Sequence, residues 1–190
     1  MKKFALILAA AIALYGCNSQ NPSSASAAKD QSVSTEGKKP VPQFDLAKVS
    51  GGSLKAADLK GKVTVLDFWA TWCESCIPEI PGYNAIQAKY GDKIEMLGVT
   101  MDSGSADDIK AKAQEFKVNY PLLVGDDKVV EGFGGLIGYP TTFVISKDGN
   151  IYKKYLGAPP GKQERILKDI ETLLAAEPAQ EKPKTVAPQS

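Results

Sequence analysis

Two of the three cysteines in this 190-residue chain, Cys73 and Cys76, have two residues between them in the stretch WCESC. Thiols at this spacing can exchange electrons through a reversible disulfide, bind a metal, or form an inert pair. A structural zinc site needs about four ligands, but the chain contains no histidine, and Cys17 is its one further thiol. The ligand count for zinc therefore fails, and we expect neither a metal nor a cofactor.

Other cysteine chemistries lack the residues that they need. Haem attachment requires a histidine directly after the second cysteine, where this chain has Ile77. A peroxide-reducing cysteine in a Pro-x-x-x-Thr-x-x-Cys motif would have a proline where Leu66 or Trp69 stands. An inert structural disulfide is also disfavoured, because closing so short a loop removes little chain entropy.

Thiol-disulfide exchange fits the surroundings better. If a strand runs directly into a helix at Cys73, the free N–H groups and the positive end of the helix dipole favour its thiolate. Cys76 then lies one turn further along the same face, where it can attack a mixed disulfide on Cys73 and release the partner. The spacing therefore predicts a redox-active dithiol.

The composition excludes several other classes. Because the chain has no histidine, it lacks the commonest general base and every Ser/His or Cys/His nucleophile arrangement. Its formal net charge of +1, without a long basic run, predicts no nucleic acid partner. A chain that is 43% hydrophobic and 24% charged is typical of a soluble globular domain.

Alternating strands and helices are predicted around the cysteines. The apolar run at 63–68 predicts a strand covered on both faces. Apolar residues then recur at three- and four-residue spacing from Ile77 to Tyr90, before Gly91, which predicts a helix. A second buried strand is expected at 94–101.

The second half continues this alternation. Ser105 and Asp108 resemble a capping box that opens a helix. Strands at 141–146 and 151–156 flank an Asp-Gly turn, which predicts a hairpin, and a last helix follows around 166–174. With a short hairpin around Gly51-Gly52 as an N-terminal β extension, these elements predict an α/β fold, a mixed β-sheet with helices on both faces.

Both ends of the chain are expected to lie outside this domain, which we place at 43–176. Residues 1–16 carry two lysines and then an uncharged apolar stretch, typical of a secretory signal peptide and too short to span a bilayer. Polar residues dominate 17–42, which predicts a flexible tether with an r.m.s. reach of about 25 to 30 Å. The Pro-rich, charged residues 177–190 predict a disordered tail.

Several motifs together resemble the thioredoxin superfamily. They are DFWATWCESC, the later GYPTTF at 138–143 and the β/α order. The segment ending LKGK, Glu79 three residues after the second cysteine, and the run from Tyr120 to Gly149 resemble the TlpA/ResA/CcmG branch of anchored extracytoplasmic thiol-disulfide proteins. The resemblance covers roughly residues 43–175 and implies a thioredoxin fold.

The resemblance also implies roles for single residues. Tyr139-Pro140 matches a cis-proline that faces the dithiol, with an ordinary trans turn as the alternative, and Trp72 matches a residue packed beside the dithiol, unless it is a core aromatic. Glu79 matches an acid near the thiols, with a solvent-facing side chain as the alternative. Asp67 matches a buried aspartate that could take and return a proton during exchange. Which of the two acids does this stays open.

Cys17 ends the apolar N-terminal stretch after Gly16 and resembles the lipobox of bacterial lipoproteins. This resemblance implies that Cys17 is lipidated, which would anchor the protein to a membrane on the periplasmic or outer side. The alternatives are cleavage at a nearby alanine, which would leave a free thiol, and an uncleaved anchor.

The family as a whole implies a membrane-tethered thiol-disulfide oxidoreductase. Its partners would be disulfide-containing exported proteins and an upstream membrane thiol donor, with cytochrome c maturation as one client pathway. Three alternatives remain at this point: a disulfide-forming oxidant of the same fold, a copper-binding protein, and a non-catalytic binding module. The missing histidine disfavours copper.

Overall fold

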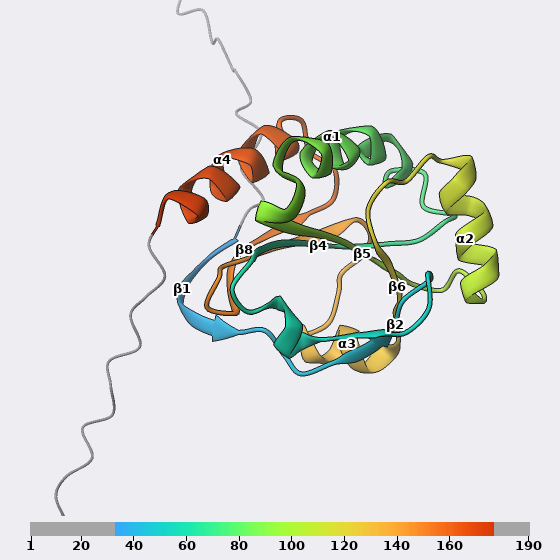
Figure 1. Ribbon diagram of the computed structural model, residues 1–190, viewed down its shortest axis with the longest axis horizontal. Helices are drawn as coiled ribbons and strands as arrows, with labels where there is room; N and C mark the ends of the chain where they lie inside the picture. The colour runs from blue at the N-terminus through green and yellow to red at the C-terminus, as the bar shows by residue number, and fades with distance from the viewer. Residues whose placement is uncertain (1–32, 177–190) are drawn as a thin grey trace, which may run out of the picture. The chain divides into compact units, whose positions relative to one another are not determined.

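The structure, a computed structural model, describes residues 33–176 (Figure 1). The predicted signal peptide, Cys17, the first part of the predicted tether and the predicted tail lie outside the described residues. The elements follow one another along the chain as β1 (Val33–Pro40), β2 (Asp45–Ala47), β3 (Ser53–Lys55), η1 (Ala56–Leu59), β4 (Val63–Trp69), η2 (Ile77–Glu79), α1 (Ile80–Tyr90), η3 (Gly91–Lys93), β5 (Ile94–Thr100), α2 (Ala106–Glu115), β6 (Leu122–Val124), α3 (Asp127–Gly132), β7 (Thr141–Ile145), β8 (Asn150–Leu156) and α4 (Lys162–Ala175).

A six-stranded mixed sheet forms the centre, in the order β1-β8-β7-β4-β5-β6. Strand β4 lies inside it, parallel to β5 on one side and antiparallel to β7 on the other. All seven residues of β4 are buried, which explains why its sequence is a nearly continuous apolar run. Asp67, the single charged residue of this strand, is therefore buried inside the protein.

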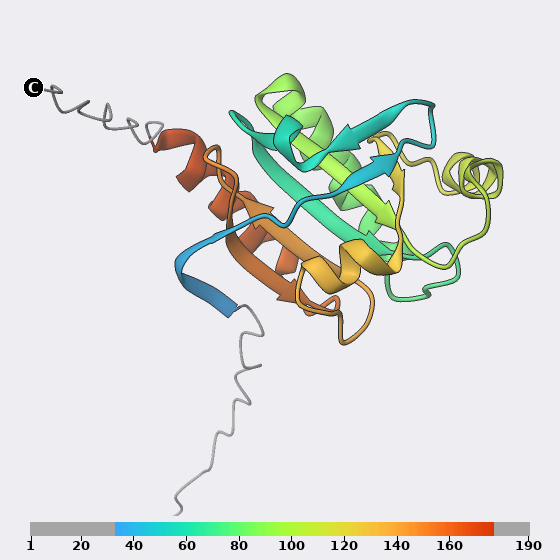
Figure 2. The same cartoon turned by 90° about the horizontal axis from the view of Figure 1, so that it is seen from below.

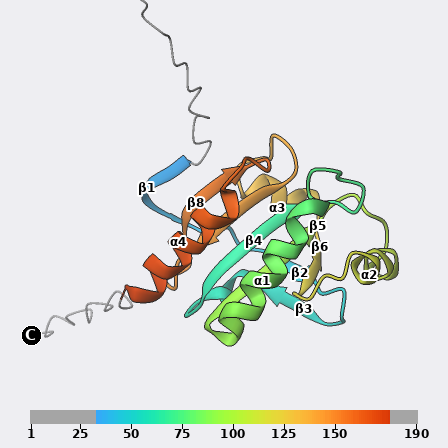
Figure 3. The same ribbon diagram turned by 90° about the horizontal axis from the view of Figure 1, so that it is seen from above.

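Helices cover both faces of the sheet, so the predicted α/β class and layering are confirmed. Helices α1 and α4 lie side by side on one face (Figures 1 and 3). Their buried residues, such as Tyr83 and Ile166, join Cys73 and Cys76 in one apolar cluster. Helix α3 and the β2–β3 hairpin lie on the opposite face (Figure 2), where Phe133 and Leu46 join a second cluster.

The β7–β8 hairpin and the start of α2 agree with the sequence patterns. Strands β7 and β8 pair antiparallel, and Gly149 in their turn has a φ of +77°, which a residue without Cβ adopts at least cost. At α2, the Ser105 hydroxyl accepts from the Asp108 N–H, and the Asp108 carboxylate accepts from the Ser105 N–H. Both predictions are confirmed.

Two elements were missed between α2 and β7. Strand β6 has three residues and helix α3 has six, so neither is long enough to produce a clear periodic pattern. Their stability comes from tertiary packing, because so short a helix is marginal by itself in water. Val129 of α3 is buried against the sheet.

The predicted boundary between tether and domain at residue 42 is wrong. Residues Val33–Pro40 form β1, which pairs antiparallel with the edge strand β8. An edge strand is held by backbone hydrogen bonds to its neighbour, so β1 can form without an apolar side-chain pattern. Among residues 33–176, no helix combines the length and the apolar character that a membrane span requires.

Candidate active site

Cys73 and Cys76 are joined by a disulfide, with an S–S distance of 2.04 Å. The loop between β4 and α1 holds them close together, since the Cys76 and Ile77 N–H groups both donate to the Cys73 carbonyl. Cys73 retains 6% of its surface and Cys76 only 2%. A partner's sulfur can therefore reach Cys73 more easily than Cys76.

The regular helix begins later than the sequence pattern predicts. Turns and the short 3₁₀ helix η2 follow Cys73, and α1 starts only at Ile80. Pro78 and Pro81 explain the delay, because neither has an N–H to donate to the preceding turn. Cys73 is thus not in the first turn of an α-helix, and the helix dipole acts on it less than expected, since this effect falls off within one turn.

A hydroxyl group lies close to the same sulfur. The Ser75 Oγ is 3.5 Å from the Cys73 Sγ, and Ser75 is exposed. A hydroxyl can donate to a thiolate, and a hydrogen bond to the charged form stabilises that form. In the reduced protein the Ser75 hydroxyl is placed to donate to a Cys73 thiolate, a contact that does not require a helix at Cys73.

Trp72 packs beside a second loop and is not a core aromatic, since its side chain is 60% exposed. Its indole N–H donates to the Asp102 carbonyl at 2.9 Å, and its ring lies 6.0 Å from the ring of Tyr139. The Tyr139 hydroxyl donates to the Asp102 carboxylate at 3.3 Å. Asp102, which no sequence motif singled out, thus joins the cysteine loop to the segment before Pro140.

The Tyr139–Pro140 peptide bond is cis, as the resemblance implies. Pro140 is buried at the head of β7, and its carbonyl accepts from the Gly157 N–H. The Thr141 hydroxyl closes the turn by donating to the Gly138 carbonyl at 2.7 Å. This segment and the cysteine loop meet through the contact between the Trp72 and Tyr139 rings.

Asp67 is buried on the face of the sheet that α1 and α4 cover, since it alternates with Leu66 and Phe68 of the opposite face. Its Oδ1 accepts from the Thr142 hydroxyl at 2.6 Å and from the Tyr83 hydroxyl at 3.4 Å. Burial raises the pKa of Asp67 from 3.8 to about 7, against the attraction of Lys162 and the two hydrogen bonds. This carboxyl can therefore change its protonation state near neutral pH.

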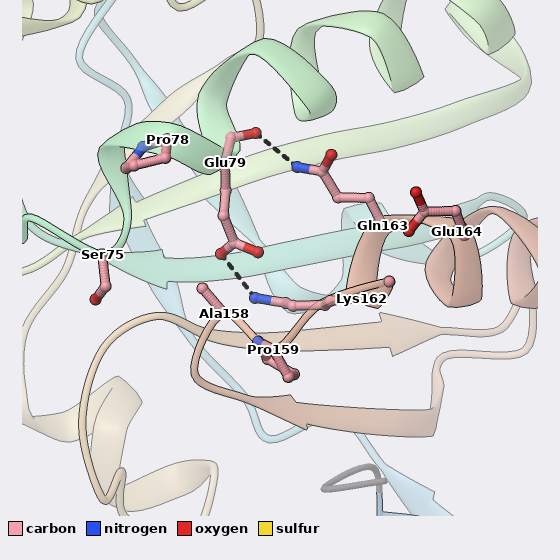
Figure 4. Close-up of a pocket in the computed structure, with 9 residues that line it drawn as sticks. Ser75, Pro78, Glu79, Ala158, Pro159, Lys162, Gln163 and Glu164 are labelled. Carbon is pink, nitrogen blue, oxygen red and sulfur yellow. Dashed lines mark hydrogen bonds and ion pairs between the residues drawn. The ribbon is translucent and has the colours of Figure 1, made fainter. Parts of the chain in front are cut away.

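Glu79 is also buried, so the alternative of a solvent-facing side chain is wrong. Its Oε2 lies 2.8 Å from the Nζ of Lys162, the first residue of α4 (Figure 4). The Glu79 carbonyl accepts from the Gln163 side-chain amide at 2.8 Å. Burial raises the pKa of Glu79, and the Lys162 ammonium opposes this shift.

The sequence analysis missed Lys162, because a lysine at the start of a polar helix is normally solvated. Here its side chain is only 1% exposed. Only the resemblance that places Glu79 near the thiols could have pointed to Lys162. A carboxylate that is buried there needs a cationic or hydrogen-bonding partner.

A surface pocket of about 420 Å³ opens beside the disulfide loop. It is lined by the residues of that loop and by the start of α4, among them Ser75, Pro78, Glu79, Pro159, Lys162 and Gln163 (Figure 4). The Glu79–Lys162 pair thus lies between this pocket and the protein interior. Within residues 33–176, no group of three His, Cys, Asp or Glu side chains could hold a metal ion.

Comparisons with known proteins agree with this geometry. The AhpC/TSA family model matches residues 38–154. The chain is 31% identical over 133 residues to the thioredoxin-like protein YneN of Bacillus subtilis (strain 168), covering 69% of this chain and 78% of YneN. It is 32% identical over 134 residues to the thiol-disulfide oxidoreductase ResA of Bacillus thuringiensis (strain Al Hakam), covering 70% and 77%.

Among solved structures, a thiol:disulfide interchange protein of the thioredoxin family from Chlorobium tepidum TLS superposes with a TM-score of 0.64 at 26% identity, covering 73% of this chain and 97% of that one. The predicted thioredoxin fold is therefore confirmed. The chain belongs to the AhpC/TSA family, and its named relatives include thiol-disulfide oxidoreductases.

Proposed function

We propose that this protein is a membrane-tethered thiol-disulfide oxidoreductase that reduces disulfides of exported proteins. The observation that carries the proposal is the Cys73–Cys76 disulfide in a loop with one more accessible sulfur. The relatives named as thiol-disulfide oxidoreductases support the enzyme class. A pair that formed only a structural staple would add little stability, because its loop is so short.

In the reduced enzyme, the Cys73 thiolate attacks a sulfur of the partner's disulfide, which releases one partner thiolate and forms a mixed disulfide. Cys76 then attacks the Cys73 sulfur, so that the Cys73–Cys76 bond forms and the second partner thiolate leaves. The partner gains two electrons, which the enzyme dithiol loses, and the two partner thiolates take up protons from the surrounding water. An upstream membrane thiol donor restores the dithiol.

The surrounding residues have distinct parts in this cycle. Trp72 presents an exposed aromatic surface beside Cys73, where it can pack on a bound segment. The backbone at Tyr139-Pro140 lies in reach of the same segment, since the Tyr139 ring contacts Trp72. One buried acid, Asp67 or Glu79, moves the Cys76 proton, because an acid with a pKa near the working pH does this most efficiently.

The location of the enzyme belongs to the same proposal. Residues 1–16 would act as a signal peptide and Cys17 would carry the lipid, so that the protein works outside the cytoplasm on the periplasmic or outer face of a membrane. The resemblance to the TlpA/ResA/CcmG branch supports cytochrome c maturation as a client pathway. Metabolic labelling with a fatty acid should mark the wild type and leave Cys17→Ser unlabelled; an unlabelled wild type rejects the anchor.

Reduction of insulin disulfides tests the activity. Cys73→Ser should abolish it, and Cys76→Ser should accumulate a mixed disulfide with the substrate, because nothing resolves it. A matched control is Thr172→Ala, which removes an exposed hydroxyl of α4 and keeps both sulfurs. Undiminished activity in both cysteine variants would eliminate the proposed function.

The direction of electron flow has its own measurement. Equilibration of the dithiol with glutathione gives its reduction potential, and a value well below that of glutathione supports a reductant. A potential near that of a strong oxidant would replace the proposed role with disulfide formation on the same fold.

A further inference from the structure

Three charged side chains interact with one another on the face of the sheet where the disulfide packs, and the exchange cycle needs only one of them to move a proton. They are Asp67 on β4, Glu79 at the end of η2 and Lys162 at the start of α4. All three are buried. Two carboxyls and one ammonium cannot all be ionised there without leaving one negative charge unpaired, which is costly in a protein interior.

Geometry decides which carboxyl is paired. The Lys162 Nζ donates to the Glu79 Oε2 at 2.8 Å and to the Gly157 carbonyl at 2.9 Å. Asp67 instead accepts its hydrogen bonds from the hydroxyls of Thr142 and Tyr83. A direct bond to an ammonium favours the carboxylate more than hydrogen bonds from neutral hydroxyls do.

The rest of the surroundings keeps this arrangement in place. Gln163, next to Lys162, donates to the Glu79 carbonyl at 2.8 Å, so the start of α4 holds both the backbone and the side chain of Glu79. Gly82 in α1 makes room for this contact, because a Cβ there would stand 1.8 Å from the Gln163 Oε1. The ion pair is therefore a built contact between α4 and the segment that follows Cys76.

We propose that Lys162 is a positioning residue that assigns the proton to one of the two acids: it holds Glu79 as a carboxylate and leaves Asp67 to take the proton of Cys76 and return it. This inference rests on the proposed exchange function. It also answers the question that the sequence left open between Asp67 and Glu79.

The Cys76 proton moves to Asp67 during resolution and returns during reduction of the disulfide. When Cys76 resolves the mixed disulfide, its thiol proton passes to the Asp67 carboxylate, and the Cys76 sulfur bonds to the Cys73 sulfur. The bond between Cys73 and the partner breaks, and its electron pair leaves with the partner thiolate. When a donor thiol later reduces the Cys73–Cys76 bond, the Asp67 proton returns to the Cys76 sulfur.

Two buried tyrosines near the site are suited to stay neutral. Burial raises the pKa of both Tyr83 and Tyr120 above the ordinary value, and the charges of Asp67 and Glu79 raise both further. Asp169 lies about two turns after Lys162 along α4, and its carboxylate accepts from the hydroxyl of Tyr155 on β8 at 2.6 Å. The pKa of about 7 for Asp67, by contrast, allows it to cycle at neutral pH.

The first test is the pH dependence of the resolving step, measured on the full chain by rapid mixing with a small disulfide. The wild type should show an inflection near pH 7. Asp67→Asn should lose this inflection, and Glu79→Gln should keep it. Lys162→Met should move it to higher pH, because the attraction that lowers the pKa of Asp67 is gone; a rise of about one pH unit would slow resolution at pH 7 about fivefold.

Two further variants separate charge from structure. Glu79→Gln combined with Lys162→Met removes both charges of the pair. The pH of its inflection should lie closer to the wild-type value than the inflection of Lys162→Met does. Lys89→Met breaks the exposed pair between Lys89 and Glu171 and should leave the profile unchanged. The proposal is overturned if Lys162→Met has the pH profile of the wild type. It is also overturned if Glu79→Gln loses the inflection while Asp67→Asn keeps it.

A titration of the wild-type protein needs no folded lysine variant. Carboxyl carbon shifts measured by NMR should show Glu79 ionising at lower pH than Asp67, and the reverse order overturns the proposal. This result is independent of turnover. If Cys73→Ser were as active as the wild type, the exchange function would be rejected. The order in which Glu79 and Asp67 titrate would still show whether Lys162 holds Glu79 as a carboxylate.

Discussion

Replacement of Asp67 by Asn should stabilise the protein at alkaline pH and change its stability much less under acidic conditions. The side chain is buried between α1 and the sheet, and it receives hydrogen bonds from Thr142 and Tyr83. Asn has nearly the same shape and keeps an oxygen that can accept these bonds. What the substitution removes is the ionisation of a group enclosed in an apolar environment.

The magnitude follows from the pKa of Asp67, which burial raises from 3.8 to about 7. Below pH 3.8 the carboxyl is protonated in both the folded and the unfolded chain. Between these values the folded chain holds a proton that the unfolded chain has lost, so the free energy of unfolding falls by about 1.4 kcal/mol per pH unit. The loss reaches about 4 kcal/mol above pH 7, of which about 3 kcal/mol falls between pH 5 and pH 9.

Urea denaturation of the oxidised wild type and of Asp67→Asn at pH 5 and pH 9 measures this effect. The difference in unfolding free energy between the two proteins should move in favour of Asn by about 3 kcal/mol from pH 5 to pH 9. Asp107→Asn, an exposed change in the first turn of α2, is the matched control and should show a pH-dependent change of less than about 1 kcal/mol. If the difference between wild type and Asp67→Asn is the same at both pH values, desolvation does not govern this carboxyl and the reasoning is refuted.

Three further changes have definite expected outcomes. Lys162→Met should lower the urea-derived unfolding free energy by about 3 to 5 kcal/mol, because it leaves the Glu79 carboxylate buried and unpaired, whereas adding Glu79→Gln should recover most of the loss. Trp72→Ala should slow reduction of insulin while changing turnover of a small disulfide little, since the exposed indole can contact only a large partner; equal slowing of both substrates would contradict this role. Gly98→Ala should cost about 1 to 3 kcal/mol in thermal or urea unfolding, because the added Cβ would stand 2.5 Å from the Leu122 Cδ2, and an unchanged midpoint would show that the Leu122 side chain can move aside without loss of packing.

Much of the fold could be predicted because local patterns carry it. The nearly continuous apolar run of β4 predicts a strand covered on both faces, and the Ser105–Asp108 box predicts the start of α2. Strand β6 and helix α3 were missed because they are too short for a periodic signal. The start of α1 was placed too early because two prolines interrupt the backbone hydrogen bonds of a pattern that otherwise reads as one helix.

The chemistry of the site could be predicted from short motifs and composition. The spacing of Cys73 and Cys76 in WCESC, together with the missing histidine, indicated a redox pair, because both features depend on residues close together in the chain or on composition. The tertiary structure decided what the acids can do. Asp67 receives a hydroxyl from Thr142, 75 residues later, and Glu79 receives the ammonium of Lys162, 83 residues later. Protonation depends on burial and on such distant partners, and these arise only when the sheet and the helices pack together.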